Sequence, residues 1–191
     1  MNNQLNTPLE GYQVLLKPVT KQHLEQLRLW RNSEHVRRFM LTQDEITQEQ
    51  QLAWFAHICR SQNQKHYVIE YRQQLIGSCN LKVMGNTVDI QEAKHFEIGL
   101  YIGEPKYLAN IIAFAPALVL NDYCFTTLNA ELLHAVVKPE NQAALRYNQR
   151  LGYQKASQTE LIELTLNESD YQKSSQIIKR LLDRPAKKIE D

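Results

Sequence analysis

Glu97 is the side chain best placed for acid–base chemistry, because it is a carboxylate within the otherwise apolar segment 96–102. A carboxylate positioned beside a reacting group can take a proton from it. His95 shares the strand parity of Glu97, and His66 precedes a different strand-like segment, so both rank below Glu97 as proton acceptors. The competing interpretation is a glutamate on the sheet surface that pairs with a lysine or an arginine.

A phosphate-binding site is predicted where the segment 96–102 ends and a helix over 113–128 begins. The first N–H groups of a helix have no internal partner and carry a partial positive charge, so they can bind an anion. Lys106 adds a positive charge just upstream of this helix. The alternative is that the helix is buried and its start binds nothing.

Asn141 opens a second helical unit, which ends at Gly152 and follows the strand-like segment 132–138. Asparagine is a favoured helix N-cap, and glycine is favoured in the left-handed conformation that closes a helix. Between them, Ala144 and Leu151 recur at a spacing that predicts a side facing the core.

The elements that position these side chains follow from two hydrophobic periods. A period of two predicts strands, and a period near 3.6 predicts helices. The predicted strands cover 12–18, 67–71, 75–83, 96–102, 132–138, 153–156 and 160–166, with turns at 72–74 and 85–86. The predicted helices begin at Thr20, cover 34–40, follow a capping box at 47–50, cover 113–128, run from Asn141 to Gly152, and cover 169–182.

This order predicts a mixed α/β (α+β) fold with a central, mostly antiparallel sheet flanked by helices. The length of 191 residues predicts a single domain over 1–191, in which 1–10 is a flexible tail and 168–191 a C-terminal helix and tail.

The composition excludes several classes of partner. A formal charge of +1 gives no global field for nucleic acid, and no apolar stretch approaches the ~20 residues that cross a bilayer. Residues 1–11 do not resemble a signal peptide, so we expect a cytoplasmic protein without a membrane or nucleic-acid partner. Cys59, Cys79 and Cys124 lack metal-ligand spacing and are predicted to be reduced core thiols, and no metal is expected.

The order of elements and the run from Asn141 to Tyr153 resemble the GNAT acetyltransferases, over nearly the whole chain from Tyr12 to Leu166. The resemblance implies the GNAT acyl-CoA N-acyltransferase fold and acetyl-CoA as co-substrate. It implies direct transfer of the acetyl group to a primary amine, with Glu97 accepting the proton of the ammonium. The residues implied to bind acetyl-CoA are Leu100, Tyr101 and Ile102 in a strand bulge, and Lys106, Ala109, Asn110, Ile111, Ile112 and Ala113 in the loop after it.

The second CoA motif of the family is matched in part. Asn141 and Ala144 fit it, but Asn148 stands where many members have the tyrosine that protonates the leaving thiolate. An asparagine can donate a hydrogen bond but not a proton. Tyr147, one residue earlier, is either a displaced acid or a core aromatic. Because Ile111 also replaces a glycine of the phosphate loop, we expect weaker acetyl-CoA affinity and slower catalysis.

The acceptor is suggested by the segment 27–55, which resembles the N-terminal helices of UDP-amino-sugar N-acetyltransferases of the pseudaminic-acid type. That resemblance implies a nucleotide-linked amino sugar, acetylated on its 4-amino group. Arginines can clamp a diphosphate, and apolar side chains can cover a uracil face. The candidate residues are Arg31, Arg37, Arg38, Met40, Trp54 and Phe55.

Three alternatives stay open for this half of the chain. Ribosomal-protein-type N-terminal acetyltransferases share the helix pattern and act on a peptide N-terminus. A non-catalytic acyl-CoA or nucleotide-binding module would explain Ile111 and Asn148, and solvated helix faces carry arginines without any function. Dimers are common in the family, so a homodimer is compatible with the sequence.

Overall fold

The computed structural model describes residues 7–85 and 89–183, and in this part of the chain eight strands form one sheet with the order β1-β2-β3-β4-β5-β6-β8-β7. The strands are β1 (Leu9–Gly11), β2 (Val14–Pro18), β3 (Gln64–Tyr71), β4 (Gln74–Val83), β5 (His95–Ile102), β6 (Leu132–Val137), β7 (Gln154–Gln158) and β8 (Ile162–Leu166). The helices are α1 (Leu24–Asn32), α2 (Glu34–Arg37), α3 (Gln48–Ile58), α4 (Ala115–Asp122), α5 (Gln142–Leu151) and α6 (Glu168–Leu182). Short 3-10 turns lie at Lys21–His23, Pro105–Tyr107 and Ile111–Phe114, and a π-helical turn, Tyr123–Thr127, extends α4.

All neighbouring strands pair antiparallel except β5 and β6, which pair in parallel. The prediction of a mixed α/β fold with a mostly antiparallel sheet is therefore confirmed. None of the helices in the described part of the chain is long and apolar enough to cross a membrane.

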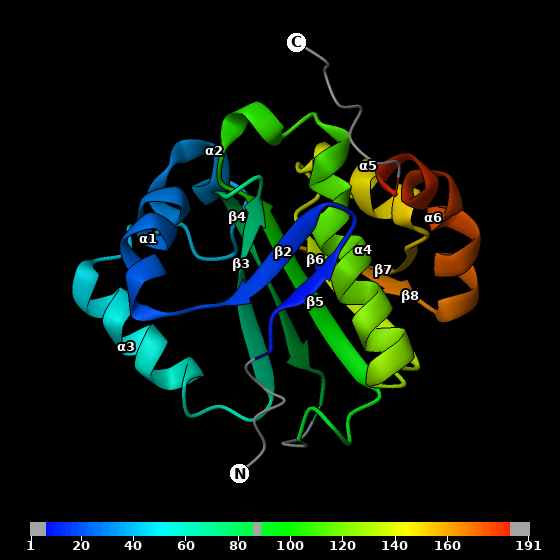
Figure 1. The fold of residues 1–191 in the computed structure, drawn as a ribbon, viewed down its shortest axis with the longest axis horizontal. Helices are drawn as coiled ribbons and strands as arrows, with labels where there is room; N and C mark the ends of the chain where they lie inside the picture. The colour runs from blue at the N-terminus through cyan, green and yellow to red at the C-terminus, as the bar shows by residue number, and fades with distance from the viewer. Residues whose placement is uncertain (1–6, 86–88, 184–191) are drawn as a thin grey trace.

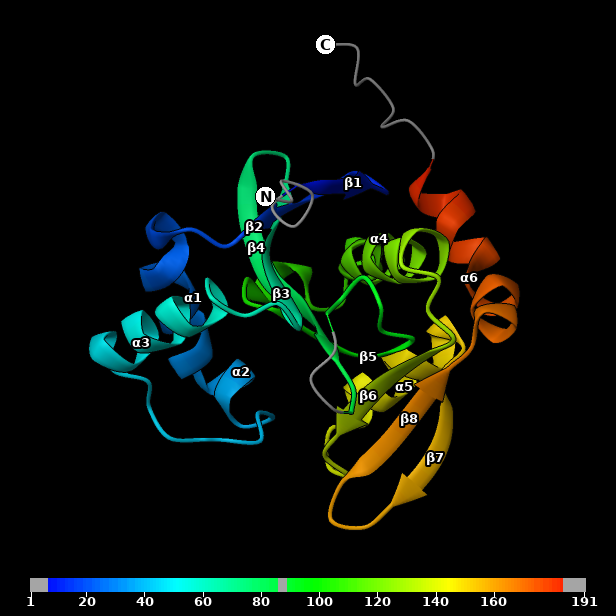
Figure 2. The same ribbon diagram turned by 90° about the horizontal axis from the view of Figure 1, so that it is seen from below.

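The two faces of the sheet are covered by different helices. Helices α1 to α3 lie against one face, while α4, α5 and α6 lie against the other (Figure 1 and Figure 2). The large core lies on the α4 side and includes Phe96, Leu118 and Leu133, all fully buried. On the α1 side fewer apolar side chains are buried, among them Leu24, Leu27, Trp30, Val36 and Val68. Most of the sheet face beneath α1 to α3 is therefore free to carry polar side chains.

Local capping signals in the sequence are confirmed. Thr47 and Gln50 form a reciprocal capping box at the start of α3, and the Asn141 side chain accepts a hydrogen bond from the Ala144 N–H at the start of α5. Gly152 ends α5 in the left-handed conformation, at φ 101°. These short-range interactions fix where both helices begin and end.

The N-terminal strand was predicted too long. Residues 12–18 form a two-residue turn and β2, because Tyr12 and Gln13 adopt positive φ and fold the chain back as the hairpin β1–β2. Leu9 to Gly11 is thus a strand, although 1–10 was predicted to be a flexible tail. Residues 1–6, 184–191 and Asn86, which complete the predicted tails and turn, lie outside the described residues.

Other boundaries also differ. The second helix stops at Arg37 instead of residue 40, and the helix predicted over 113–128 is a 3-10 turn, an α-helix and a π-helical turn in succession. Cys59 was predicted to be buried, and this is wrong because α3 leaves that side of its C-terminal end uncovered. Cys79 and Cys124 are buried as free thiols.

Asp122, the last residue of α4, joins distant parts of the chain. Its carboxylate accepts hydrogen bonds from the hydroxyl groups of Tyr12 at 2.5 Å and Tyr171 at 2.7 Å. It also pairs with the Lys179 Nζ at 2.7 Å. The β1–β2 turn and α6 are therefore both attached to the C-terminal end of α4.

Gly152→Ala is expected to destabilise the protein by about 2 kcal/mol or more. A Cβ at residue 152 would lie 2.7 Å from the Asp170 carbonyl oxygen, and the φ of 101° disfavours any side chain. The measurement is urea unfolding of the whole chain. Gly85→Ala is the matched control, since Gly85 also has positive φ (89°) but a Cβ there meets no described atom within 4 Å. Equal losses from both substitutions would contradict a packing role for Gly152.

Candidate functional site

Strands β5 and β6 separate after a short paired stretch, and the gap between them is the centre of the site. The two strands pair only at His95–Leu132, Phe96–Leu133 and Glu97–His134. Beyond that last pair, residues 98–102 pair with β4 on one side and with no described strand on the other, while β6 continues alongside β8. Because the N–H and C=O groups of a strand point alternately to its two sides, about half of those in 98–102 face the gap. An extended ligand could hydrogen-bond to them.

A cleft of about 930 Å³ runs through this gap from one side of the sheet to the other. Its α4 side is lined by β5, β6, α4 and α5. Its α1 side is lined by α1, α2, the segment that follows α2, and Trp54 of α3. The cleft therefore connects the two regions that the sequence predicted to bind cofactor and acceptor.

The structure places the predicted cofactor residues in two groups. Those that line the cleft are Leu100, Tyr101, Ile102, Ala113, Asn141, Ala144, Tyr147 and Asn148. Those that do not line it are Lys106, Ala109, Asn110, Ile111 and Ile112. Ile112 is buried in the core, Ile111 is 42% exposed, and the Lys106 Nζ donates to the side chain of Gln74.

The loop before α4 already uses some of its N–H groups. The Asn110 side chain accepts a hydrogen bond from the Ile112 N–H at 3.0 Å, and the Asn110 carbonyl accepts one from the Ala113 N–H at 3.0 Å. A phosphate held here as the sequence predicts would have to compete with Asn110 or use the remaining N–H groups. Asn110 thus acts as a helix cap in place of the glycine-rich loop of the family.

Tyr147 and Asn148 differ in how they face the cleft. The Tyr147 hydroxyl donates to the Ala113 carbonyl at 3.0 Å, and its ring stacks on Phe114 with centroids 4.5 Å apart. Burial raises the pKa of Tyr147 well above its ordinary value. The Asn148 amide nitrogen donates to the Ala144 carbonyl at 2.9 Å, which leaves the Asn148 amide oxygen available toward the cleft.

On the α1 side, the floor of the cleft is a row of polar side chains on the sheet. Alternate residues of β3, β4 and β5 point to this face, and strand pairing brings them together as His66, Asn80, Lys82 and Glu97. Lys82 lies directly opposite Glu97 in the pairing, yet no ion pair within 4.0 Å joins Glu97 to a cation among the described residues. The interpretation of Glu97 as half of a surface ion pair is not supported.

Arg31 is a partly buried cation on the acceptor side of the cleft. It is half-buried, lines the cleft, and has no carboxylate within 4.0 Å in the described part of the chain. Burial lowers the pKa of Arg31 from its ordinary value, although the guanidinium stays charged. A cation placed this way is available to an anionic ligand.

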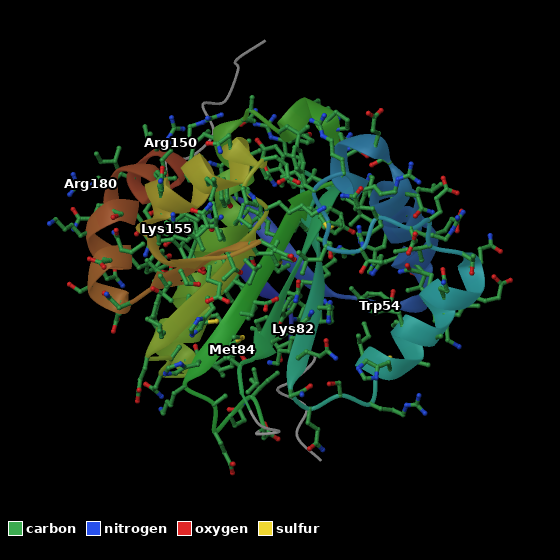
Figure 3. The ribbon with its side chains drawn as sticks, turned by 180° about the vertical axis from the view of Figure 1, so that it is seen from behind. Trp54, Lys82, Met84, Arg150, Lys155 and Arg180 are labelled. Atoms are coloured by element: carbon green, nitrogen blue, oxygen red, sulfur yellow. The ribbon has the colours of Figure 1, made fainter. Side chains whose placement is uncertain are left out.

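The other predicted acceptor residues are divided. Arg38, Met40 and Trp54 line the cleft. Arg37 instead pairs with Glu45 at 2.9 Å, and Phe55 is half-buried away from the cleft. Figure 3 shows Trp54 on one side of the molecule, Lys82 near its middle, and Arg150, Lys155 and Arg180 on the other side.

Several lining residues were not predicted from the sequence: His35, Phe39, Ser78, Asn80, Lys82 and Lys138. Asn80 and Lys82 could have been found, because antiparallel pairing of the two predicted strands puts them beside Glu97. The Lys138 Nζ reaches across to the Arg38 carbonyl at 3.4 Å. Nothing in the local sequence indicates that contact, since it joins segments 100 residues apart.

The loop that follows β5 is clamped to α1 and α2. The Trp30 Nε1–H donates to the Glu104 carboxylate at 3.1 Å, and the His35 ring lies 3.0 Å from the Gly103 carbonyl oxygen. A Cβ on Gly103 would lie 2.2 Å from the Trp30 indole. The acceptor helices and the loop that leads to α4 therefore hold each other in place.

Most of the chain, including both sides of the cleft, matches a known protein family. The model of the acetyltransferase (GNAT) domain matches residues 13–154, which is most of the chain and includes both sides of the cleft. The chain belongs to the GNAT acetyltransferase family. It has the GNAT fold and is an acetyl-CoA-dependent N-acetyltransferase.

Individual relatives of this GNAT enzyme are distant. A Mus musculus protein described as alpha/beta-tubulin-N-acetyltransferase 9 is 23% identical over 174 residues, covering 84% of this chain and 70% of the mouse protein. The Campylobacter jejuni N-acetyltransferase PseH in complex with acetyl coenzyme A has 18% identity and a TM-score of 0.60, over 81% of this chain and 99% of PseH. FdhC, described as a nucleotide-linked sugar GNAT, has 20% identity and a TM-score of 0.71, over 93% of this chain and 99% of FdhC.

Within residues 7–85 and 89–183 of this GNAT enzyme, no three His, Cys, Asp or Glu side chains gather in a way that could hold a metal ion. The lining of the cleft offers main-chain groups, amides, two arginines (Arg31 and Arg38) and three carboxylates (Asp44, Glu45 and Glu97). These groups fit an extended thioester and a charged acceptor.

Gly103→Ala is expected to lower the stability by about 1–3 kcal/mol and to raise the KM for acetyl-CoA. The new methyl group would displace Trp30 and with it the loop that leads to α4. Urea unfolding and initial rates measure the two effects. The double variant Trp30→Leu/Gly103→Ala should lose less than the sum of the two single losses, because Leu makes room for the methyl group. Additive losses would show that the clash is not the cause.

His66 is expected to make the stability depend on pH. Burial, followed by the nearby Lys82 and His57, lowers the pKa of His66 from 6.5 to about 4. The unfolded chain therefore binds the proton first, so stability should fall by up to about 3 kcal/mol as the pH drops from 6.5 toward 4.

His66→Gln should flatten the pH dependence of stability in this window, as measured by urea unfolding at a series of pH values. His57→Gln is the comparison, and it should flatten the dependence only in small part, because His57 is the smallest of the three causes of the low pKa of His66. An unchanged slope in His66→Gln would show that another group causes the pH dependence.

Proposed function

We propose that this GNAT enzyme acetylates the 4-amino group of a nucleotide-linked amino sugar, with a UDP sugar as the best candidate. The observation that carries the proposal is Arg31, a half-buried guanidinium in the acceptor end of the cleft without a carboxylate partner among the described residues. A diphosphate would neutralise this charge and could accept two parallel hydrogen bonds from it. Arg38 and Lys82 line the same end of the cleft and add positive charge.

The remaining surfaces of this end suit a nucleoside and a sugar. Phe39, Met40 and Trp54 supply apolar and aromatic area, and the Trp54 ring is fixed edge-on to His66 with centroids 5.2 Å apart. Aromatic faces of this kind cover nucleobases. FdhC, a nucleotide-linked sugar GNAT by its description, shares the fold over 93% of this chain.

The proposed reaction is direct transfer between the two substrates. The pantetheine arm lies in the gap beside Leu100, Tyr101 and Ile102, where main-chain N–H groups polarise the thioester carbonyl. Glu97 takes the proton from the ammonium, and the neutral amine then attacks the carbonyl carbon. The C–S bond breaks and CoA leaves as a thiolate. The Asn148 amide nitrogen is bonded to the Ala144 carbonyl, and Tyr147 can act as an acid only after its hydroxyl leaves Ala113, so the thiolate takes its proton from the nitrogen of the new amide, directly or through water.

A second candidate acceptor is a protein N-terminus. The observations that favour it are the distant mouse relative, which is a tubulin N-acetyltransferase by its description, and the acidic Asp44 and Glu45 that line the cleft beside the arginines. Carboxylates attract the positive charge of a peptide N-terminus and repel a diphosphate. The balance of charge at the acceptor end decides between the two substrates.

The acceptor is tested by measuring thiol release from acetyl-CoA with UDP-4-amino sugars, with N-terminal peptides and without an amine. We expect turnover with a UDP-4-amino sugar. Turnover with peptides alone would overturn the proposal, and acetyl-CoA binding without any turnover would indicate a binding module.

Arg31→Gln should raise the KM for the nucleotide sugar by about tenfold or more, as expected for loss of a charge-assisted contact, with little change in the KM for acetyl-CoA. Initial-rate kinetics with each substrate varied in turn measure this. Arg180→Gln on α6 is the matched control, because Arg180 is exposed on the opposite side of the molecule (Figure 3). Equal effects of the two substitutions would count against Arg31 as a diphosphate ligand.

A further inference from the structure

We propose that His134 and His95 carry the proton taken up by Glu97 from the acceptor amine out to solvent. His134 is the direct partner of Glu97 in the β5–β6 pairing, at the last pair before the strands part. The His134 Nε2 lies 3.4 Å from the His95 Nδ1, and the two rings are 5.5 Å apart. The inference rests on Glu97 as the base in the proposed reaction and not on which amine is acetylated.

Among Glu97, His134 and His95, solvent exposure is greatest at His95, as required if a proton leaves the protein there. Glu97 lines the cleft and is half-buried, His134 is half-buried, and His95 is exposed. His95 and Glu97 are two residues apart on one strand, so their side chains point to the same face of the sheet. His134 shares that face because it is paired with Glu97. The three side chains thus lie in one row from the cleft to water, in which His134 and His95 are within hydrogen-bond distance and the proposed step from Glu97 to His134 runs through a water molecule.

The charges around His134 come from three strands. On β5, His95 and Glu97 face it, on β8 its neighbours are Thr165 and Glu163, and on β4 Lys82 lies one strand further away beside Glu97. Burial and His95 lower the pKa of His134, and Glu163 and Glu97 oppose this in part. The net effect is a lowered pKa, so His134 is neutral at neutral pH and can accept a proton.

Each proton step is balanced. The ammonium gives one proton to the Glu97 carboxylate, and the amine lone pair forms the new C–N bond as the C–S bond breaks. The second proton that the nitrogen loses goes to the leaving CoA thiolate, directly or through water. The Glu97 carboxylic acid passes its proton to the free ring nitrogen of His134. The other ring nitrogen of His134 gives its proton to His95, and His95 gives one to water. Glu97 is thereby returned to the carboxylate form for the next turnover.

His134→Gln and His95→Gln should each lower kcat by about tenfold or more, a smaller effect than the roughly 100- to 10,000-fold of a group that transfers the proton of the reacting atom itself. A relay can be bypassed by a small diffusible base, so added imidazole at constant ionic strength should restore kcat. The acid limb of the kcat/KM profile should also move to lower pH in His134→Gln, because an imidazolium no longer forms there. A purely structural role would produce neither the rescue nor the shift.

Two controls make the result decisive. Glu97→Gln/His134→Gln should be no slower than Glu97→Gln, since the two residues act in one path. His23→Gln, at a histidine that hydrogen-bonds to Thr20 far from the cleft, should keep the parent kcat. An unchanged kcat in His134→Gln, or a fall that imidazole does not restore and that leaves the pH profile unmoved, would overturn the relay.

The test also separates the relay from the choice of substrate, because it uses whichever amine of the acceptor panel is acetylated. If none is, the substrate proposal fails by itself, and NMR titration of the histidine ring protons decides on the relay. Glu97→Gln should then lower the pKa of His134 further, since the carboxylate opposes the lowering. A pKa of His134 that is the same in Glu97→Gln and in the parent would overturn the relay.

Discussion

The parallel pairing of β5 with β6 stops after three residue pairs, and the rest of the site depends on that interruption. Had the pairing continued, the main-chain groups of residues 98–102 would be satisfied within the sheet and no cleft would pass through it. Each strand keeps its other partner, β4 for β5 and β8 for β6, so the opening does not detach either strand. The sheet can hold unpaired hydrogen-bonding groups at its centre because both sides of the gap are anchored.

Strand alternation then gives the cleft two different sides. On β5, Phe96, Ile98, Leu100 and Ile102 pack into the core against α4, whereas Glu97 and Tyr101 face the acceptor helices. One strand thus contributes apolar packing to the cofactor side and a carboxylate to the acceptor side. A shift of one residue in the β4–β5 pairing would exchange the two sets, which is why the core fixes the position of Glu97, the proposed base.

Short-range features were predictable from the sequence, and long-range ones were not. The capping box at Thr47, the Asn141 cap and the Gly152 end of α5 follow from contacts within four residues, and all are as expected. The hairpin turn at Tyr12 and Gln13 was missed because neither residue type favours positive φ, and tertiary contacts such as that of Tyr12 with Asp122 hold it.

The same limit applies to the site. Glu97 and Arg31 could be proposed because residue type and local pattern mark them. Lys138 and His35 could not, since each acts on the cleft through a contact with a distant segment, Arg38 and Gly103 respectively. Cys59 was placed wrongly because periodicity shows that a helix has an apolar side but not whether anything covers that side.

Asp122 joins α4 to two segments that lie outside the part of the chain matched by the family model. A half-buried carboxylate needs hydrogen-bond or charge partners, and here two tyrosine hydroxyls and Lys179 supply them. Tyr12, Tyr171 and Lys179 all lie outside residues 13–154, the part that matches the family model. The β1–β2 turn and α6 are therefore both attached to α4, whose opposite end meets the loop proposed to bind acetyl-CoA. Removing the β1–β2 hairpin and α6 would leave the Asp122 carboxylate without Tyr12, Tyr171 and Lys179.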